Sequence, residues 1–120
     1  MSKKTLVLGA SLKTNRYSNF AIKKLIKNNH EVVAVGMIEG EVNGVKIETK
    51  KPDFNSVDTV ALYLNAKRQK EYYDYIISLK PKRVIFNPGT KNMEFMKLLE
   101  VKGIEAEEAC TLVLLSTKQY

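Results

Sequence analysis

Short apolar runs alternate along the chain with segments in which apolar residues recur at helical spacing. Consecutive apolar positions are typical of strands covered on both faces, and four such runs predict buried parallel strands: residues 6–8, 31–36, 57–64 and 83–86. Segments with apolar residues three or four positions apart predict three helices: residues 19–28, 72–80 and 95–101. This alternation predicts an α/β fold with a mainly parallel sheet.

Turn residues and weaker patterns complete the set of predicted elements. Asn43-Gly44 lies in the middle of the alternating segment 41–47 and favours a type I′ hairpin, so we expect a small β-ribbon insertion after the second strand. A short run at 104–106 predicts a fifth strand of the sheet. Residues 109–115 fit either a short closing helix or a sheet edge, and we favour the helix.

The simplest arrangement of these elements is one Rossmann-like, doubly wound domain over residues 1–120. Its five strands, numbered along the chain, would take the order 3-2-1-4-5. Ligands of such sheets bind beyond the carboxyl ends of the strands, at the point where the strand order reverses. Here that switch point would lie between the first and fourth strands, so the turn at 9–11 should face the turn at 87–90.

Composition and charge fit an ordinary globular domain. Of 120 residues, 44% are hydrophobic and 28% charged, and the longest nearly apolar run, 57–64, is far too short to span a bilayer. The first residues lead straight into a strand pattern instead of a signal peptide, so we expect a cytoplasmic protein without a membrane partner. The net charge of +7 favours either a polyanionic partner or simple solubility. The lysines are scattered over helix faces, and nucleic acid is not an expected partner.

Several kinds of active site are disfavoured by the residues that the sequence lacks. Cys110 is the only cysteine and His30 the only histidine, which excludes an internal disulfide and a cysteine-based zinc site and gives a poor basis for Ser-His catalysis. Neither the glycine fingerprint of dinucleotide enzymes nor the P-loop motif is present. Gly36 and Met37 stand where an acid would hold the ribose of NAD, and Glu39 is the nearest carboxylate.

The loop after the first strand is the strongest candidate for a binding site. The small residues at 9–11 carry the chain toward a helix start near Ser18, and unpaired N–H groups at such a junction bind anions. The hydroxyls of Ser11 and Ser18 and the charges of Lys13 and Arg16 would add to an anion site. A structural interpretation stays open beside it: the small residues allow close packing, Ser18 caps the helix, and the two cations are solvated.

Two further strand ends offer candidate contacts to a ligand. Tyr63 and Asn65 end the third strand and could line the pocket of a base. The turn at 87–90 is either a plain turn or a second ligand contact opposite the loop.

Five short motifs follow one another along the chain: Gly9-Ala10-Ser11, Arg16-Tyr17-Ser18, the segment 42–46, Asn87-Pro88-Gly89 with Asn92, and the ending 108–110. In this order they resemble the small stand-alone CoA-binding proteins, whose Rossmann-like domain is also found at the front of succinyl-CoA synthetase α-type chains. The resemblance covers the whole chain. Family members commonly carry prolines after the second strand, where this chain has Gly36-Met37-Ile38-Glu39.

The resemblance implies non-catalytic binding of coenzyme A or an acyl-CoA through the Gly-Ala-Ser phosphate loop. In the synthetases the catalytic histidine lies in a later domain that this sequence does not contain, so binding is implied and an enzyme is not expected. The implied ligand contacts are Gly9, Ala10, Ser11, Lys13, Arg16, Tyr17, Ser18, Asn65, Asn87, Pro88, Gly89 and Asn92. The alternative is an NAD(P)- or other nucleotide-dependent enzyme subunit that a partner completes, with Glu39, Asn65 and Thr90 as its candidate residues. A homodimer or an unidentified protein partner is compatible with both.

Overall fold

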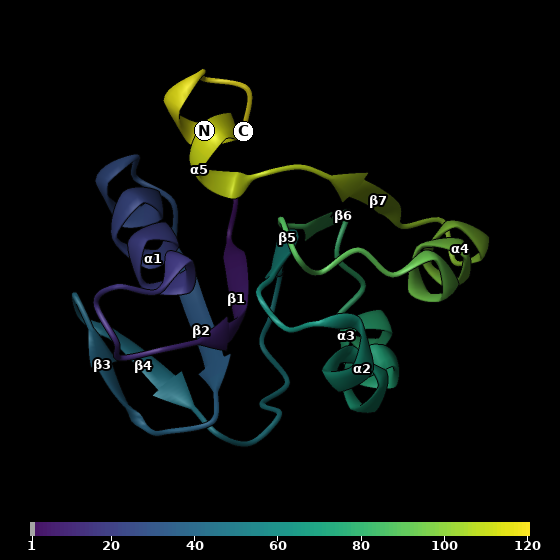
Figure 1. The fold of residues 1–120 in the computed structure, drawn as a ribbon, viewed down its shortest axis with the longest axis horizontal. Coiled ribbons are helices and arrows are strands. Elements are labelled where there is room, and N and C mark those ends of the chain that lie inside the picture. Colours follow the sequence, from purple (N-terminus) through teal and green to yellow (C-terminus); the bar gives the residue numbers. More distant parts are fainter. Residues whose placement is uncertain (1) are drawn as a thin grey trace.

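The computed structural model describes residues 2–120, which form a seven-stranded sheet flanked by helices (Figure 1). The strands are β1 (Thr5–Ala10), β2 (Val32–Gly36), β3 (Gly40–Val42), β4 (Val45–Glu48), β5 (Thr59–Leu62), β6 (Arg83–Phe86) and β7 (Glu105–Glu108). The helices are α1 (Tyr17–Lys27), α2 (Ala66–Gln69), the 3₁₀ turn η1 (Lys70–Tyr72), α3 (Tyr73–Ser78), α4 (Met93–Val101) and α5 (Thr111–Ser116). All neighbouring strands are parallel except the β3–β4 hairpin, which confirms the predicted α/β class with a mainly parallel sheet.

The β-ribbon predicted after the second strand is present, but it belongs to the sheet. Asn43 and Gly44 have φ angles of 48° and 86°, as a type I′ turn requires. β4 then pairs in parallel with β2, and Ala34 lies opposite Ile47. The prediction of five strands is therefore wrong, because β3 and β4 of the ribbon are part of the sheet, which has seven strands. Val45 and Ile47 of β4 are buried in the core.

The strand order also differs from the predicted 3-2-1-4-5. The observed order is β3-β4-β2-β1-β5-β6-β7, so the third predicted strand, β5, lies beside β1: Leu6 pairs with Val33 on one side and with Val60 on the other. β4 occupies the outer edge of β2, which leaves the free edge of β1 for the next parallel strand. The switch point consequently lies between β1 and β5, and the turn after β5 is the direct neighbour of the loop after β1.

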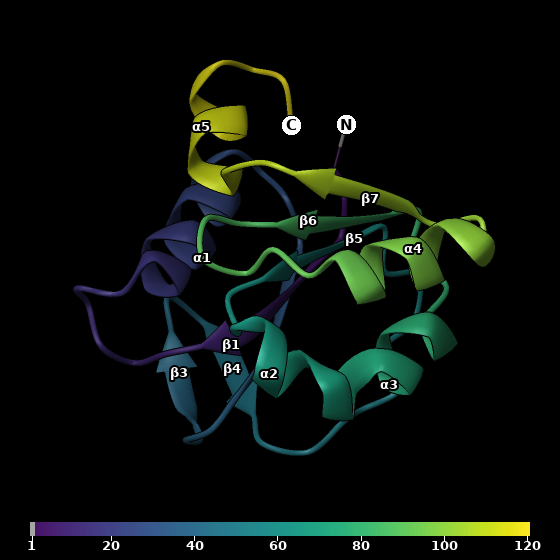
Figure 2. The same cartoon turned by 45° about the vertical axis from the view of Figure 1, so that its right-hand side comes forward.

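Helices cover both faces of the sheet (Figures 1 and 2). α1 and α5 lie on one face, and α2, α3 and α4 lie on the other. Side chains alternate along β1 accordingly: Val7 belongs to a buried cluster with Ile22 of α1 and Leu115 of α5, whereas Leu6 belongs to a second cluster with Phe95 of α4. The sheet is therefore buried from both sides, as its continuous apolar runs predict.

Two predicted helices have other boundaries than expected. α1 begins at Tyr17, so Ser18 lies inside its first turn and does not cap it, and Arg16 precedes the helix without a capping side chain. The segment predicted as a helix over 72–80 belongs to a longer helical stretch in which α2, η1 and α3 follow one another without a break. The closing helix favoured near the end of the chain is confirmed as α5.

Candidate functional site

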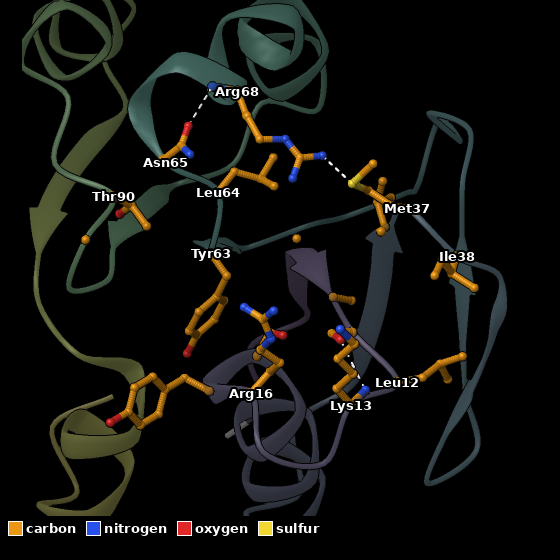
Figure 3. A pocket seen from close by; sticks show the side chains of 18 of the residues that line it. Leu12, Lys13, Arg16, Met37, Ile38, Tyr63, Leu64, Asn65, Arg68 and Thr90 are labelled. Atoms are coloured by element: carbon orange, nitrogen blue, oxygen red, sulfur yellow. Dashed lines mark hydrogen bonds between the residues drawn. The ribbon is translucent and has the colours of Figure 1, made fainter.

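A cleft of about 550 Å³ opens at the carboxyl ends of the central strands (Figure 3). Its lining comes from the turns after β1, β2, β5 and β6 and from α1, α2 and η1: Gly9, Ala10, Ser11, Leu12, Lys13, Arg16, Tyr17, Ser18, Val35, Gly36, Met37, Ile38, Tyr63, Leu64, Asn65, Arg68, Tyr72, Pro88, Gly89 and Thr90. A volume of this size is typical of small-molecule sites. The cleft lies at the switch point that the observed strand order defines.

Two glycines let the loop after β1 pass close to its neighbours. The register of β1 on β2 shifts between Leu8 and Ala10, so Gly9 is an extra residue that bends the strand. Gly9 has a φ of +96°, and a Cβ there would lie 3.0 Å from the backbone carbon of Tyr63. On the other side, a Cβ on Gly36 would lie 2.3 Å from the carbonyl oxygen of Ala10. Both positions need glycine, because a side chain at either one would displace the backbone of the loop.

Hydrogen bonds tie the loop to the start of α1. Asn19 donates from Nδ2 to the carbonyl oxygen of Ser11 over 2.9 Å, and the backbone N–H of Lys13 donates to Ser11 Oγ over 3.1 Å. The backbone N–H of Arg16 donates to the carbonyl of Lys13, also over 3.1 Å. These hydrogen bonds fix the conformation of the loop without a ligand.

The first turn of α1 leaves N–H groups unpaired at the cleft. The N–H groups of Asn19 and Phe20 donate to the carbonyl of Arg16 over 3.1 and 3.2 Å, whereas those of Tyr17 and Ser18 have no acceptor among residues 2–120. The first turn of α1 carries no acidic side chain, so the positive end of the helix dipole is not neutralised. Such a helix start favours an anion.

Three cations line the cleft, and its lining contains no Asp or Glu. Lys13 and Arg16 come from the loop after β1, and Arg68 comes from α2. None of the ion pairs found within residues 2–120 includes these three side chains. Figure 3 shows Arg16 and Arg68 reaching the cleft from opposite sides, and the guanidinium of Arg68 donates to Sδ of Met37. The cleft therefore concentrates positive charge that ligand phosphates can balance.

Tyr63 presents its ring to the cleft and buries its hydroxyl. Among the described residues, Tyr63 Oη and Thr111 Oγ1 are buried without a hydrogen-bond partner of good geometry. Burial raises the pKa of Tyr63, and the nearby Thr111 hydroxyl opposes this effect in part. The phenol is therefore neutral at physiological pH and offers the cleft an aromatic surface.

Asn65 lines the cleft and also caps α2, because its side chain accepts the N–H of Arg68 over 3.0 Å. In the turn after β6, Pro88 and Gly89 line the cleft, and the N–H of Thr90 closes the turn on the carbonyl of Asn87 over 3.0 Å. This turn reaches the cleft although β6 is not adjacent to β1.

The side chains of Asn87 and Asn92 lie behind the cleft and bind protein groups. Asn87 donates to the carbonyl of Leu62 over 3.0 Å and accepts the N–H of Thr111 over 2.8 Å, which ties β5 to the start of α5. Asn92 caps α4 and donates to Gln69 Oε1 over 3.0 Å. Both residues are buried and outside the cleft lining, so they support the turn after β6 structurally.

The structure thus brings ten of the twelve predicted contact residues into one cleft: Gly9, Ala10, Ser11, Lys13, Arg16, Tyr17, Ser18, Asn65, Pro88 and Gly89. Sequence reasoning missed Arg68, because α2 was not predicted. The signal that could have found it is Asn65, a favoured N-cap residue directly after a strand.

Two kinds of feature are absent from residues 2–120. No helix in this part of the chain is long and apolar enough to cross a membrane. No group of three His, Cys, Asp or Glu side chains in it is arranged to hold a metal ion.

Comparison with known proteins identifies the family. A profile of the CoA binding domain matches residues 3–116. The chain belongs to the CoA-binding domain family. Membership supports an association with CoA in general, and it agrees with the resemblance carried by the sequence motifs. A search of curated proteins gave no match.

Solved structures similar to this CoA-binding domain share its fold over most of the chain. A crystal structure of an uncharacterised protein is 49% identical, with a TM-score of 0.98 and coverage of 100% of this chain and 99% of the other. A hypothetical protein from Pyrococcus horikoshii is 27% identical, with a TM-score of 0.88 and coverage of 97% and 83%. Part of a dinucleotide-forming acetyl-coenzyme A synthetase from Ca. Korarchaeum cryptofilum is 15% identical, with a TM-score of 0.72 and coverage of 89% and 25%, and shows the fold alone.

Proposed function

We propose that the protein binds coenzyme A or an acyl-CoA in the cleft at the switch point and that it does so without catalysis. The observation that carries this proposal is the lining of the cleft: three unpaired cations and no carboxylate beside the free N–H groups of α1. Family membership narrows the anion to a CoA-type ligand.

The loop after β1 would hold the pyrophosphate of the ligand. The N–H groups of Tyr17 and Ser18 would donate to its oxygens, and the side chains of Lys13 and Arg16 would balance its charge. The Ser11 hydroxyl adds a donor at the same turn. Because existing hydrogen bonds already fix this loop, little ordering cost accompanies binding.

The residues of the cleft favour binding over chemistry. Its lining contains no His, Cys, Asp or Glu that could act as general acid, base or nucleophile. Burial keeps the Tyr63 phenol protonated by raising its pKa, so this residue is a poor base. We therefore propose a binding module, and an enzyme would need groups from a partner chain.

Isothermal titration calorimetry and thermal unfolding with CoA test the proposal. A ligand present at 100 times its dissociation constant stabilises the folded state by about 2.7 kcal/mol, so CoA should raise the melting temperature clearly. Ser11→Leu places a bulky side chain in the phosphate path and should abolish this shift. The matched control is Ser116→Leu, at the exposed end of α5 and outside the cleft, which should keep the shift.

Two results would contradict the proposal. No shift with millimolar CoA but a clear shift with NAD or NADP would favour the nucleotide-dependent enzyme subunit instead. A CoA shift that survives Ser11→Leu would move the phosphate site away from the loop after β1.

A further inference from the structure

Arg68 is a cation of the cleft that neither the loop motif nor the family match assigns to a ligand. It lies on α2, whose first turn is fixed by the Asn65 cap. The next residue, Gln69, is fully buried and donates from Nε2 to the carbonyls of Leu64 and Thr90 over 2.8 and 2.7 Å. α2 is thus anchored on both sides of Arg68, so the position of its backbone is fixed relative to the cleft.

The side chain of Arg68 spans the mouth of the cleft. Arg68 follows β5 in the chain, and its guanidinium contacts Met37, which follows β2. β5, β1 and β2 are consecutive in the sheet, so the contact between Arg68 and Met37 bridges the end of β1. Figure 3 shows Arg68 extending from α2 toward Met37 above the loop that carries Lys13 and Arg16.

The end of β2 is the place where sheets of this kind recognise the ribose of an adenosine. In dinucleotide enzymes a carboxylate there binds the 2′-hydroxyl of the ribose, whereas a nearby arginine accommodates a 2′-phosphate. The ribose phosphate of CoA is on the neighbouring 3′ carbon. In this chain Gly36, Met37 and Ile38 line the cleft at the end of β2, and the following Glu39 is exposed and outside the lining. The guanidinium of Arg68 therefore contacts the residue that follows β2, and the lining contains no carboxylate that would compete for it.

We infer that Arg68 binds the phosphate on the ribose of the ligand, apart from the pyrophosphate on the loop after β1, and so selects CoA over dephospho-CoA. The inference rests on the proposed CoA site and adds a second, separate phosphate position to it. A planar guanidinium can hold a phosphate through two parallel hydrogen bonds. The contact of Arg68 with the thioether of Met37 is weak by comparison and would yield to the phosphate.

Binding of CoA and dephospho-CoA to paired variants tests this inference. The unmodified protein should bind CoA at least tenfold more tightly than dephospho-CoA in calorimetric titrations. Arg68→Gln should weaken CoA binding at least tenfold and leave dephospho-CoA binding unchanged, so that the preference is lost. Arg68→Lys should retain part of the preference, because it keeps the charge but not the paired hydrogen bonds.

The matched control is Lys67→Gln, which removes the same charge from the neighbouring, exposed position of α2 outside the cleft lining. It should keep the preference for CoA. Equal binding of CoA and dephospho-CoA by the unmodified protein, or an Arg68→Gln variant that keeps the preference or weakens both ligands alike, would overturn the inference and leave the proposed function intact. Binding of neither ligand by the unmodified protein would overturn both.

Discussion

Replacing Gly36 with alanine should strain the contact between β2 and the loop after β1. A Cβ at this position would lie 2.3 Å from the carbonyl oxygen of Ala10 and 3.0 Å from Cγ2 of Ile47. Close contacts between carbon and carbonyl oxygen in proteins are about 3.3 Å or longer. The carbonyl of Ala10 would therefore have to move by about 1 Å, and with it the bulge at Gly9 that directs the loop into the cleft.

The expected loss of stability depends on which atom the new methyl group would contact. Overpacking a well-packed interior costs about 1–3 kcal/mol, and the upper end applies here because the obstructing atom is main chain between two paired strands. Alanine also lowers the conformational entropy of the unfolded chain, which offsets about 0.4–1 kcal/mol of this loss of stability. We therefore expect the free energy of unfolding to fall by about 2 kcal/mol in Gly36→Ala.

Gly40→Ala provides the matched control. A Cβ on Gly40 would lie 2.6 Å from Cδ2 of Leu12, but Leu12 is a flexible side chain that is 41% exposed and can turn away. Neither Gly36 nor Gly40 has a positive φ, so the two variants differ mainly in what the new methyl group meets. We expect Gly40→Ala to cost less than about 0.5 kcal/mol.

Urea denaturation followed by circular dichroism measures both losses, and CoA titration of the folded variants measures the effect on the cleft. Gly36→Ala should also weaken CoA binding, and it should do so more than Gly40→Ala, which displaces only the Leu12 side chain of the lining. The reasoning is refuted if Gly36→Ala is as stable as Gly40→Ala, or if it is destabilised as expected yet binds CoA as tightly as the unmodified protein.

Two further predictions concern residues outside the cleft. His30 Nδ1 accepts the backbone N–H of Lys3 over 2.9 Å, and burial followed by the charge of Lys3 lowers the pKa of His30 below 6.5. The unfolded chain takes up a proton at His30 near pH 6.5, whereas the folded protein does so only at lower pH, so the free energy of unfolding should fall as pH drops below about 6.5. In urea denaturation, His30→Asn should make the free energy of unfolding depend less on pH. The same pH dependence in the variant and the unmodified protein would contradict this prediction. Asn92→Ala removes the cap of α4 and leaves Gln69 Oε1 without its partner, so it should lower the free energy of unfolding by about 2 kcal/mol with CoA affinity unchanged. A loss of CoA affinity at unchanged stability would instead make Asn92 the ligand contact that the family motif implies.

Elements whose burial shows directly in the sequence could be predicted. β1 and β6 are covered on both faces, so their apolar runs at 6–8 and 83–86 coincide closely with the strands. The hairpin at Asn43-Gly44 could be predicted because its turn needs two residues with positive φ, which this pair supplies. The loop after β1 could be placed at the cleft because a strand and a helix flank it, and that order alone brings the loop to the carboxyl edge of the sheet.

The order of the strands could not be predicted, because apolar periodicity says which segments are buried and not which edge they occupy. The deciding fact is a pairing remote in sequence: Ala34 of β2 lies opposite Ile47 of β4, so the ribbon closes the outer edge of β2. β5 must then add to β1. Asn87 does not line the cleft, although the rest of its turn does, because its side chain is buried and bonded to Leu62 and Thr111, where it holds β5 and α5 together.

The position of β5 also decides which side chains determine the chemistry of the cleft. With β5 beside β1, the turn at Asn65 faces the loop at Gly9, and Arg68 must extend across the end of β1 to reach Met37. With β5 outside β2, as predicted, the same side chain would reach Met37 without passing over the loop. The polar sequence of α2, Ala66–Gln69, carries no helical apolar pattern, so neither the helix nor its arginine could be recognised from periodicity. Family motifs can therefore locate the loop after β1, but the third cation of the cleft, Arg68, depends on a topological choice that they do not encode.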